Sequence, residues 1–321
     1  VTTLAFEVLL LVAGIGVLYF GAEWLVRGAA RLAGSLGVSP IVVGLTVVSF
    51  GTSAPELVVC TVAALGGNSD LAVGNVMGSN LANIGLILGI TAMIRPLSVA
   101  ARVVVREVPL MLIVTLAVYP LAWWDHQLGR GDGIFLLMAL VAYLVFVFQS
   151  VEEEAPEIIG EYREYLEESE QTAAAVRLTD VGLVVAGCSA LVLGGYAIVE
   201  GAVAVAEFLG VSQTAIGLSV VAVGTSLPEL ATAVVAAMRN EADIAVGNVV
   251  GSNIFNIAAI LGAASLARPI DIGSTILVRE LPAVLVMSVC LLPLLRTGWR
   301  IQRWEGAVLL GGYLAFGAWI L

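Results

Sequence analysis

The feature that most constrains this chain is a series of about ten apolar stretches, each roughly 20 residues long and nearly free of charge. Ile134–Gln149 and Ala307–Leu321 are two of them. A helix of about 20 apolar residues crosses a hydrocarbon layer about 30 Å thick. Hydrophobic residues make up 60% of the chain and charged residues only 12%, too few to cover the surface of a water-soluble enzyme. We therefore predict an all-α membrane protein.

The chain also contains one sequence unit twice. Shifted by 173 residues, it aligns with itself without a gap, and residues 37–90 match residues 210–263 at 30 of 54 positions. The match continues more weakly outward, for example from Arg106-Glu107 to Arg279-Glu280. Internal duplication on this scale is typical of membrane proteins built from structural repeats.

Each copy contains five apolar spans, which predicts ten transmembrane helices. The predicted spans are Leu4–Val26, Val38–Leu65, Leu71–Ile94, Val103–Trp124, Gly133–Ser150, Leu178–Val199, Val211–Met238, Ile244–Ala267, Ile276–Leu295 and Glu305–Leu321. An odd number of spans per copy turns the second copy upside down relative to the first. The predicted division is residues 1–151 for the first five-helix repeat, 152–177 for a linker and 178–321 for the second, inverted repeat. The first span is too long for the core of a signal peptide and has no basic start.

The arginines predict the orientation of the helices. The chain has 14 arginines and no lysine. With the N-terminus outside, eleven arginines lie on the cytoplasmic side and three, Arg130, Arg268 and Arg279, on the other. Because basic residues in short loops favour the cytoplasm, we predict a multi-pass protein of the cell membrane with both termini outside and the linker cytoplasmic.

The linker is strongly acidic. It has nine glutamates between Glu152 and Glu170, interrupted by apolar residues at helical spacing. We interpret it as a solvated amphipathic connector near the membrane face. A regulatory site for a divalent cation is the alternative, although the segment lacks the Asp/Asn and Gly pattern of a preformed calcium loop.

The best-matched parts of the two copies are also the most polar parts of their spans. Gly51-Thr52-Ser53-Ala54-Pro55-Glu56 corresponds to Gly224-Thr225-Ser226-Leu227-Pro228-Glu229. Gly74-Asn75-Val76-Met77-Gly78-Ser79-Asn80 corresponds to residues 247–253, where Ser252 is the second copy of Ser79. In both copies the serine follows the glutamate by 23 residues, and an asparagine, Asn83 or Asn256, follows it by 27.

The two glutamates need a partner. A carboxylate at the centre of a membrane costs about 2.5–3.5 kcal/mol on insertion scales, and no basic residue lies in the span of Glu56 or of Glu229. A bound cation or a proton is the remaining partner. We therefore predict that each of the two glutamates pairs with a cation or a proton inside the membrane.

The neighbouring residues suit a hard cation. Ser49, Thr52, Ser53 and Glu56 share one helix face, and Asn75, Ser79 and Asn83 share another. Pro55 has no N–H and clashes with the carbonyl four residues earlier, so the helix turn at Gly51–Thr52 is expected to open and free carbonyl oxygens. Oxygen ligands without imidazole or thiolate favour sodium or calcium over zinc or copper.

Other interpretations apply to single residues. Gly74, Gly78, Gly247 and Gly251 also permit close helix packing, and serine or threonine hydroxyls often bond back to a carbonyl of their own helix. The three cysteines lie in apolar segments without metal-ligand spacing and are predicted to be packing residues. The chain has no enzymatic motif of the common hydrolase or nucleotide-binding types. We predict no enzyme, no permanently bound cofactor and no nucleic-acid partner.

Two GTSxPEL segments, each followed by GNVxGSN at the same offset, resemble the alpha repeats of the cation/calcium antiporter superfamily, most closely its prokaryotic sodium/calcium exchangers. The resemblance covers nearly the whole chain. It implies an antiporter that exchanges Na⁺ for Ca²⁺ by alternating access, in which spans 1 and 6 slide across a core of spans 2, 3, 7 and 8. It also implies that Na⁺, Ca²⁺ and the lipid bilayer are the partners of the chain.

The resemblance also implies a set of ligands. Glu56 and Glu229 would share calcium with the backbone of Thr52 and Thr225. Sodium would use the same glutamates with further oxygens, and the carbonyl that precedes each motif belongs to Ser49 or Ala222. The further implied ligands are the sodium-binding serines Ser53, Ser79, Ser226 and Ser252, together with Asn83 and Asn256.

Departures from related patterns indicate the coupling ion. Proton-coupled relatives typically have Asn at the positions of Thr52 and Thr225, and often His where this chain has Leu230. The residues here favour sodium coupling, and an H⁺/Ca²⁺ antiporter of the same fold is the alternative. Asn256, which is Asp in potassium-dependent relatives, argues mildly against potassium.

Overall fold

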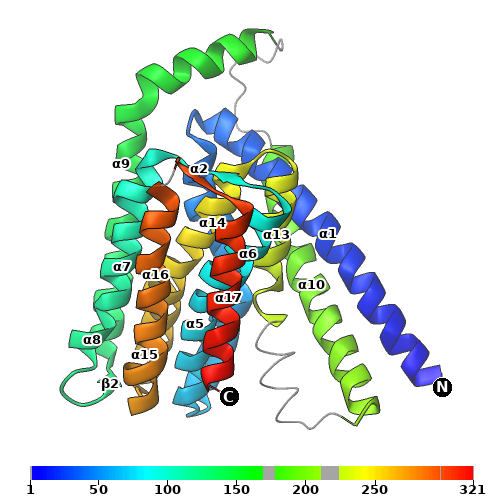
Figure 1. The fold of residues 1–321 in the computed structure, drawn as a ribbon, viewed down its shortest axis with the longest axis vertical. Coiled ribbons are helices and arrows are strands. Elements are labelled where there is room, and N and C mark those ends of the chain that lie inside the picture. Colours follow the sequence, from blue (N-terminus) through cyan, green and yellow to red (C-terminus); the bar gives the residue numbers. More distant parts are fainter. Residues whose placement is uncertain (1, 169–177, 211–223, 297, 321) are drawn as a thin grey trace.

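The computed structural model describes residues 2–168, 178–210, 224–296 and 298–320, and in these ranges the chain consists of helices, short loops and four two-residue strands (Figure 1). The helices of the first half are α1 (Thr2–Leu36), α2 (Pro40–Val43), α3 (Ser49–Thr52), α4 (Ala54–Leu65), α5 (Ser69–Ala82), α6 (Leu88–Ile94), α7 (Val108–Leu116), α8 (Val118–Leu121) and α9 (Arg130–Glu168). Those of the second half are α10 (Leu178–Phe208), α13 (Leu227–Met238), α14 (Ala242–Phe255), α15 (Gly262–Ala267), α16 (Leu281–Arg296) and α17 (Arg303–Ile320).

Short π-helical segments join several of these helices into continuous spans. They are η1 (Gly44–Val48), η2 (Asn83–Ile87), η3 (Val103–Glu107), η5 (Asn256–Leu261) and η6 (Ile276–Glu280). The described residues contain seven helices long and apolar enough to cross a membrane, and an eighth if the bent pair Pro40–Thr52 and Ala54–Leu65 is one span. The first part of the predicted span Val211–Met238 lies outside the described residues.

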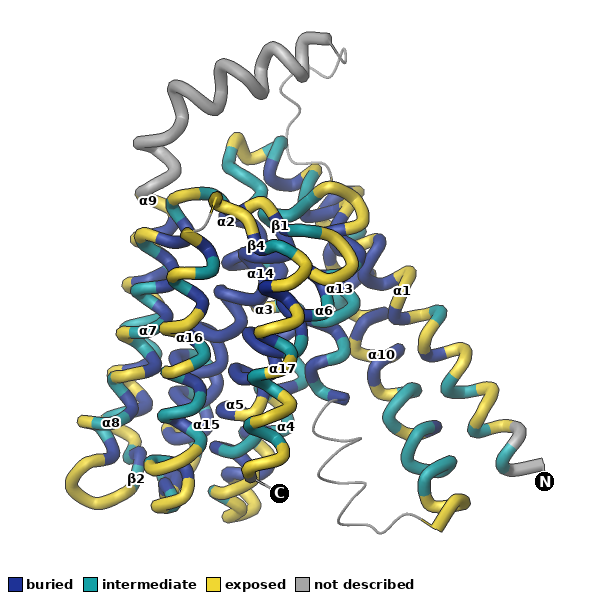
Figure 2. The backbone as a smooth tube through the Cα atoms, viewed as in Figure 1, coloured by how far each residue is buried: buried dark blue, intermediate teal, exposed yellow. Residues whose placement is uncertain are grey.

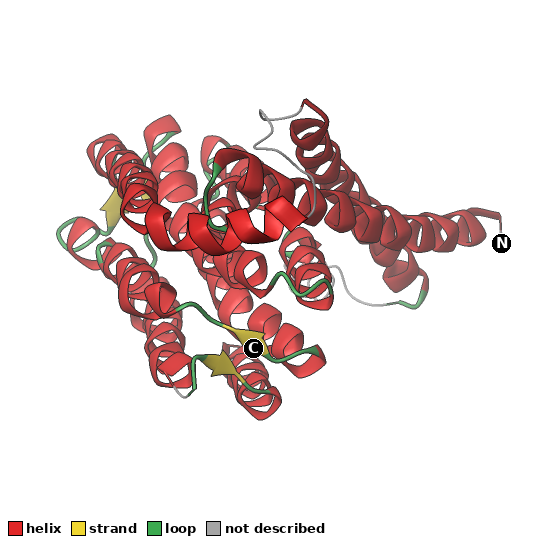
Figure 3. Ribbon diagram, turned by 90° about the horizontal axis from the view of Figure 1, so that it is seen from above, coloured by secondary structure: helices red, strands yellow, loops and turns green. Residues whose placement is uncertain are grey.

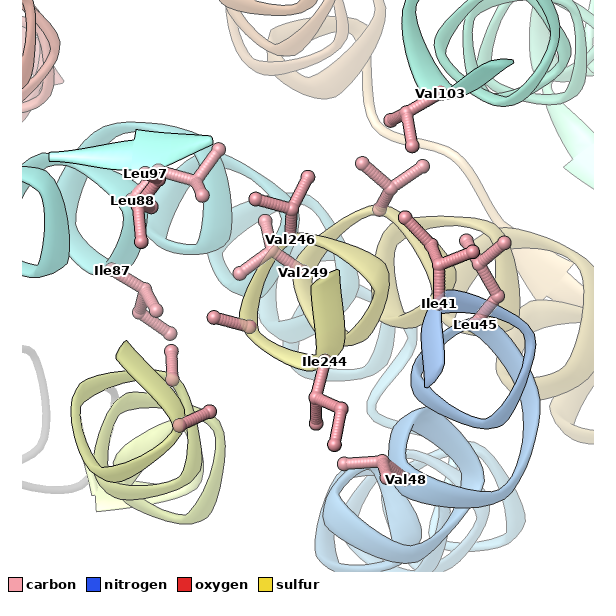
Figure 4. Close-up of a cluster of buried hydrophobic side chains, with 14 of the residues drawn as sticks. Ile41, Leu45, Val48, Ile87, Leu88, Leu97, Val103, Ile244, Val246 and Val249 are labelled. Carbon is pink, nitrogen blue, oxygen red and sulfur yellow. The ribbon is translucent and has the colours of Figure 1, made fainter. Parts of the chain in front are cut away.

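Two spans form the centre of the bundle. The α14–η5–α15 span (Ala242–Ala267) is almost wholly buried, and the α5–η2–α6 span (Ser69–Ile94) is largely buried (Figure 2). Val246 and Val249 of α14 lie between the α2–η1 segment on one side and α6 on the other (Figure 4). A span that is buried all round can keep polar side chains away from lipid.

Glycines on α14 allow its backbone to approach the α2–η1 segment closely. A Cβ added at Gly247 would lie 2.9 Å from the carbonyl oxygen of Ile41, and one at Gly251 would lie 2.6 Å from that of Leu45. These are closer than real Cβ contacts, so only glycine fits without a shift of the backbone. The predicted packing role is confirmed for these two glycines and is wrong for Gly74 and Gly78, where an added Cβ would meet no described atom within 4 Å.

The outer helices expose apolar side chains. At least 60% of each of four apolar residues is exposed: Val105, Ile113, Met138 and Val141. They lie on helices long and apolar enough to cross a membrane. An apolar surface of this kind is normal for a protein surrounded by lipid and unusual for one surrounded by water. The chain is a multi-pass membrane protein.

Helices α1 and α10 form a pair beside the bundle (Figure 3). Glycines at seven-residue intervals line their contact. A Cβ added at Gly21 would lie 2.8 Å from the backbone nitrogen of Leu191, and one at Gly194 would lie 2.6 Å from that of Leu18. The two backbones therefore touch along their length, and the pair is closely packed.

The four short strands make two ribbons at opposite ends of the bundle (Figures 1 and 2). Strand β1 (Leu97–Ser98) pairs with β4 (Arg300–Ile301), and β2 (Gln127–Leu128) pairs with β3 (Ile270–Asp271). Each ribbon thus joins one segment from each half of the chain. Helix α9 runs across the predicted boundary between residues 151 and 152 without a break.

Candidate cation site

Helix breaks place the two glutamates. Helix α3 ends at Thr52, Ser53 leaves the helical conformation at φ −81° and ψ 4°, and α4 restarts at Ala54, bent by 46°. Ser226 interrupts the second copy at φ −91° and ψ 5°. In the first copy the break falls one residue later than the predicted turn at Gly51–Thr52. The N–H of Ser53 still donates to the carbonyl oxygen of Ser49 over 3.0 Å, so the helix continues through Thr52. Each glutamate lies in the first turn of the following helix, where the N-terminal end of the helix dipole stabilises negative charge.

The structure brings Glu56 and Glu229 together in the interior. Their exposed fractions are 1% and 2%, and they are close enough for their charges to interact. The hydroxyl of Ser53 donates a hydrogen bond of 3.3 Å to Oε1 of Glu229, across the two halves of the chain. No arginine pairs with either carboxylate in the described part of the chain.

Most oxygens of this region have no hydrogen-bond partner among the described residues. Both carboxylate oxygens of Glu56 and Oε2 of Glu229 are buried and have no hydrogen-bond partner among the described residues. The same holds for side-chain oxygens of Ser79, Asn83, Ser226, Ser252 and Asn256. Buried polar atoms are normally paired, because an unpaired one loses its bonds to water without replacement. Carboxylate, hydroxyl and amide oxygens of this kind have the composition of a site for a hard cation.

The two predicted asparagines begin π-helical segments. Asn83 is the first residue of η2 and Asn256 the first residue of η5. Single π-helical turns interrupt the regular hydrogen bonding of a helix and are frequent at functional sites. Asn256 also donates from Nδ2 to Oδ1 of Asn80 over 3.0 Å, which connects the two central spans.

Two threonines occupy equivalent positions beside the carboxylates. The hydroxyl of Thr52 lies beside Glu229, and that of Thr225 lies beside Glu56 without reaching hydrogen-bond geometry. Thr52 donates instead to Oδ1 of Asn248 over 3.1 Å, and Thr225 donates to Oδ1 of Asn75 over 3.5 Å.

The remaining predicted ligands have different surroundings. The hydroxyl of Ser49 lies 2.7 Å from the carbonyl oxygen of Gly44 and 3.0 Å from that of Asn248, so it serves helix contacts. The main-chain carbonyl oxygen of Ser49, the atom predicted as the ligand, accepts from the N–H of Ser53 over 3.0 Å. Ala222 lies outside the described residues. Among the residues that the structure describes, no three His, Cys, Asp or Glu side chains form a group that could hold a metal. A cation here would therefore depend on two carboxylates and neutral oxygens.

The sequence prediction missed the roles of three asparagines. Asn248, Asn80 and Asn253 all belong to the GNVxGSN motif, but only the stripe of Asn75, Ser79 and Asn83 was predicted to face the site. Asn80 donates from Nδ2 to the carbonyl oxygen of Asn253 over 3.3 Å. The motif was the available signal, and the partner of each asparagine depends on how the two halves meet.

Comparison with known proteins decides the family. A family model described as "Sodium/calcium exchanger protein" matches residues 6–149 and again residues 179–321. The chain belongs to the sodium/calcium exchanger family. Two relatives are named as transporters. Sodium/calcium exchanger MaX1 of Methanosarcina acetivorans is 34% identical over 96% of this chain and 96% of its own length. Putative antiporter CaxA of Alkalimonas amylolytica is 37% identical over 94% of this chain and 95% of its own.

A solved exchanger structure has the same fold. The sodium-calcium exchanger NCX_Mj, soaked with zero Na⁺ and Ca²⁺, superposes with a TM-score of 0.84 at 28% sequence identity. The match covers 99% of this chain and 100% of NCX_Mj. The predicted resemblance to prokaryotic sodium/calcium exchangers is confirmed, and the chain is a membrane protein of a cation/calcium antiporter family.

Proposed function

We propose that this protein exchanges Na⁺ for Ca²⁺ by alternating access at a site shared by Glu56 and Glu229. The observation that carries the proposal is the burial of these two carboxylates side by side, with three of their four oxygens lacking a partner among the described residues. The ligand roles of the surrounding hydroxyl, amide and carbonyl oxygens are part of the same proposal.

The charge of the site explains exchange. Two ionised carboxylates carry a charge of about −2, which one Ca²⁺ or two Na⁺ would neutralise. Because the ions would share oxygens, calcium and the full set of sodium ions would exclude each other. An empty site would leave two charges unpaired in a medium of low dielectric constant, so the empty carrier would not readily change its facing state.

Two inverted repeats of five spans supply the proposed framework. A shift of 173 residues converts β1 into β3 and β2 into β4, yet β1 pairs with β4 and β2 with β3 at opposite ends of the bundle. The same shift converts η2 and η3 into the starts of η5 and η6. The two separate matches of the family model also support two units. With the arginine bias, the proposed orientation has both termini outside and the acidic linker in the cytoplasm.

Sodium is the proposed coupling ion because Thr52, Thr225 and Leu230 differ from the residues expected in proton-coupled relatives. The test is uptake of radioactive Ca²⁺ into proteoliposomes that contain the purified protein. Uptake should require an outward Na⁺ gradient and should not occur with lithium or potassium inside. Uptake driven by a pH gradient alone would establish the H⁺/Ca²⁺ alternative. Uptake without any counter-ion would indicate a pore and contradict exchange.

A further inference from the structure

Two hydrogen bonds cross between the halves of the chain at equivalent positions. Thr52 of the first half donates to Asn248 of the second, and Thr225 of the second half donates to Asn75 of the first. A shift of 173 residues converts one pair into the other. The Thr52–Asn248 pair is fully buried with an O···O distance of 3.1 Å, whereas the Thr225–Asn75 pair is half-buried at 3.5 Å.

Each asparagine is held in place by a second contact. The main-chain carbonyl oxygen of Asn248 lies 3.0 Å from the hydroxyl of Ser49, and α14 packs tightly on η1 around it. The side-chain amide of Asn75 donates to Sγ of Cys60 over 3.2 Å. Neither asparagine carries a charge, so neither would supply the main attraction for a cation.

Each threonine hydroxyl has a single proton, so its possible acceptors compete for one hydrogen bond. A hydroxyl has one proton to donate and two lone pairs. Thr52 lies beside Glu229, and without Asn248 its proton would go to that carboxylate or to the carbonyl oxygen of Ser49, which lies 3.4 Å away. When Asn248 accepts the proton, the carboxylate receives nothing from Thr52, and the lone pairs of Thr52 remain free.

We propose that Asn248 and Asn75 are positioning residues for the cation site, acting through Thr52 and Thr225. By taking the hydroxyl protons, they keep Glu229 and Glu56 short of hydrogen bonds and turn hydroxyl lone pairs toward the ions. A carboxylate with fewer hydrogen bonds gains more from a bound cation. The inference rests on the proposed function, since it concerns the affinity of the same site for its transported ions.

The test is a double-mutant cycle on Asn248 and Thr52, read in transport and in binding. Asn248→Ala should raise the apparent KM for Ca²⁺ about fivefold, the effect of one hydrogen bond, with a maximal rate near that of the wild type. In the Thr52→Val background the same change should have no further effect, because the hydroxyl through which Asn248 acts is gone. Asn75→Ala should act in the same direction but less, given its longer and more exposed hydrogen bond.

A binding measurement makes the outcome independent of turnover. Ca²⁺ should raise the melting temperature of the purified protein in detergent, and Asn248→Ala should move the half-maximal Ca²⁺ concentration about fivefold upward. Thr115→Val is the matched control, since this buried hydroxyl donates to the carbonyl of Met111 in its own helix over 2.8 Å. It should leave both values unchanged.

The possible failures are distinct. If the wild type neither binds nor transports Ca²⁺, the proposed function is wrong. If the wild type does both, but Asn248→Ala has the wild-type KM, a lower KM, or an effect that adds fully to that of Thr52→Val, the positioning role is wrong. If Asn248→Ala does not fold, the cycle of Asn75→Ala with Thr225→Val decides in the same way.

Discussion

The guanidinium group of Arg239 forms an ion pair with the carboxylate of Glu23, and this pair ties α1 to the end of α13. Glu23 is only 8% exposed and also pairs with Arg27 at 2.6 Å. The equivalent positions in the other repeat, 173 residues away, are occupied by Tyr196 and Gly66, which cannot form an ion pair. The contact therefore belongs to one end of the bundle.

Other contacts at the two ends remain equivalent. Arg95 donates to the carbonyl oxygen of Met238 over 3.3 Å, and its counterpart Arg268 donates to that of Leu65 over 3.0 Å. The Glu23–Arg239 pair is thus an added contact between the α1–α10 pair and the core. In a cycle that moved α1 and α10 across the core, the pair would stabilise the arrangement of these helices in this structure relative to the other facing state.

Glu23→Gln should shift that equilibrium. A partly exposed ion pair contributes up to about 1 kcal/mol, which corresponds to about a fivefold change in the ratio of the two facing states. The measurement is the ratio of apparent KM values for Ca²⁺ at the two membrane faces, in right-side-out and inside-out vesicles. Glu200→Gln, an exposed glutamate of α10, is the control and should leave the ratio unchanged. An unchanged ratio in Glu23→Gln would show that the pair does not bias the cycle.

Glu56→Gln and Glu229→Gln should each abolish Na⁺-driven Ca²⁺ uptake. Each change removes about half of the negative charge that neutralises the ion, while the shape of the side chain is kept. The rate should fall at least about 100-fold. Glu241→Gln is the control, because this half-buried glutamate precedes α14 outside the candidate site. Near-normal uptake in either site variant would refute the assignment of the site.

Acidification should inhibit exchange. Protons neutralise carboxylates and therefore compete with Na⁺ and Ca²⁺ for the same oxygens. The apparent KM for Ca²⁺ should rise as the pH falls from about 8 to about 5.5, with a smaller effect on the maximal rate. A KM that stays constant across this range would contradict competition at the glutamates.

Gly247→Ala should destabilise the core without changing its chemistry. The new methyl group would lie 2.9 Å from the carbonyl oxygen of Ile41, so α14 and α2 would have to separate. A cost of about 1–3 kcal/mol is expected for such overpacking, measured as a lower melting temperature in detergent. Gly311→Ala is the control, because its added Cβ meets no described atom within 4 Å. Equal melting temperatures for the two variants would contradict the tight contact.

The sequence predicted those features that depend on one large free-energy term. Glu56 and Glu229 were predicted to need a cation or a proton because the membrane gives a carboxylate few other partners. That they share one ion was implied by the family resemblance, and the two residues lie together in the fold. Pro55 predicted the helix break to within one residue, since a missing N–H must interrupt the helix locally.

The sequence could not predict contacts that depend on how the halves meet. Asn248 accepts from Thr52, and Arg239 pairs with Glu23, because tertiary packing brings together residues about 200 positions apart. Several competing hydrogen bonds of similar strength were open to each of these side chains, such as a bond back to the carbonyl of its own helix. Only the geometry of the packed bundle selects among them.

The central claim is that one cation binds between Glu56 and Glu229, and anomalous diffraction from crystals soaked in Ca²⁺ tests it most directly. The predicted result is a peak within about 2.3–2.6 Å of carboxylate oxygens from both residues, a calcium–oxygen distance. The peak should be absent from crystals of Glu56→Gln. A calcium peak bound to neither glutamate, or two carboxylates that remain apart with no ion between them, would contradict the claim.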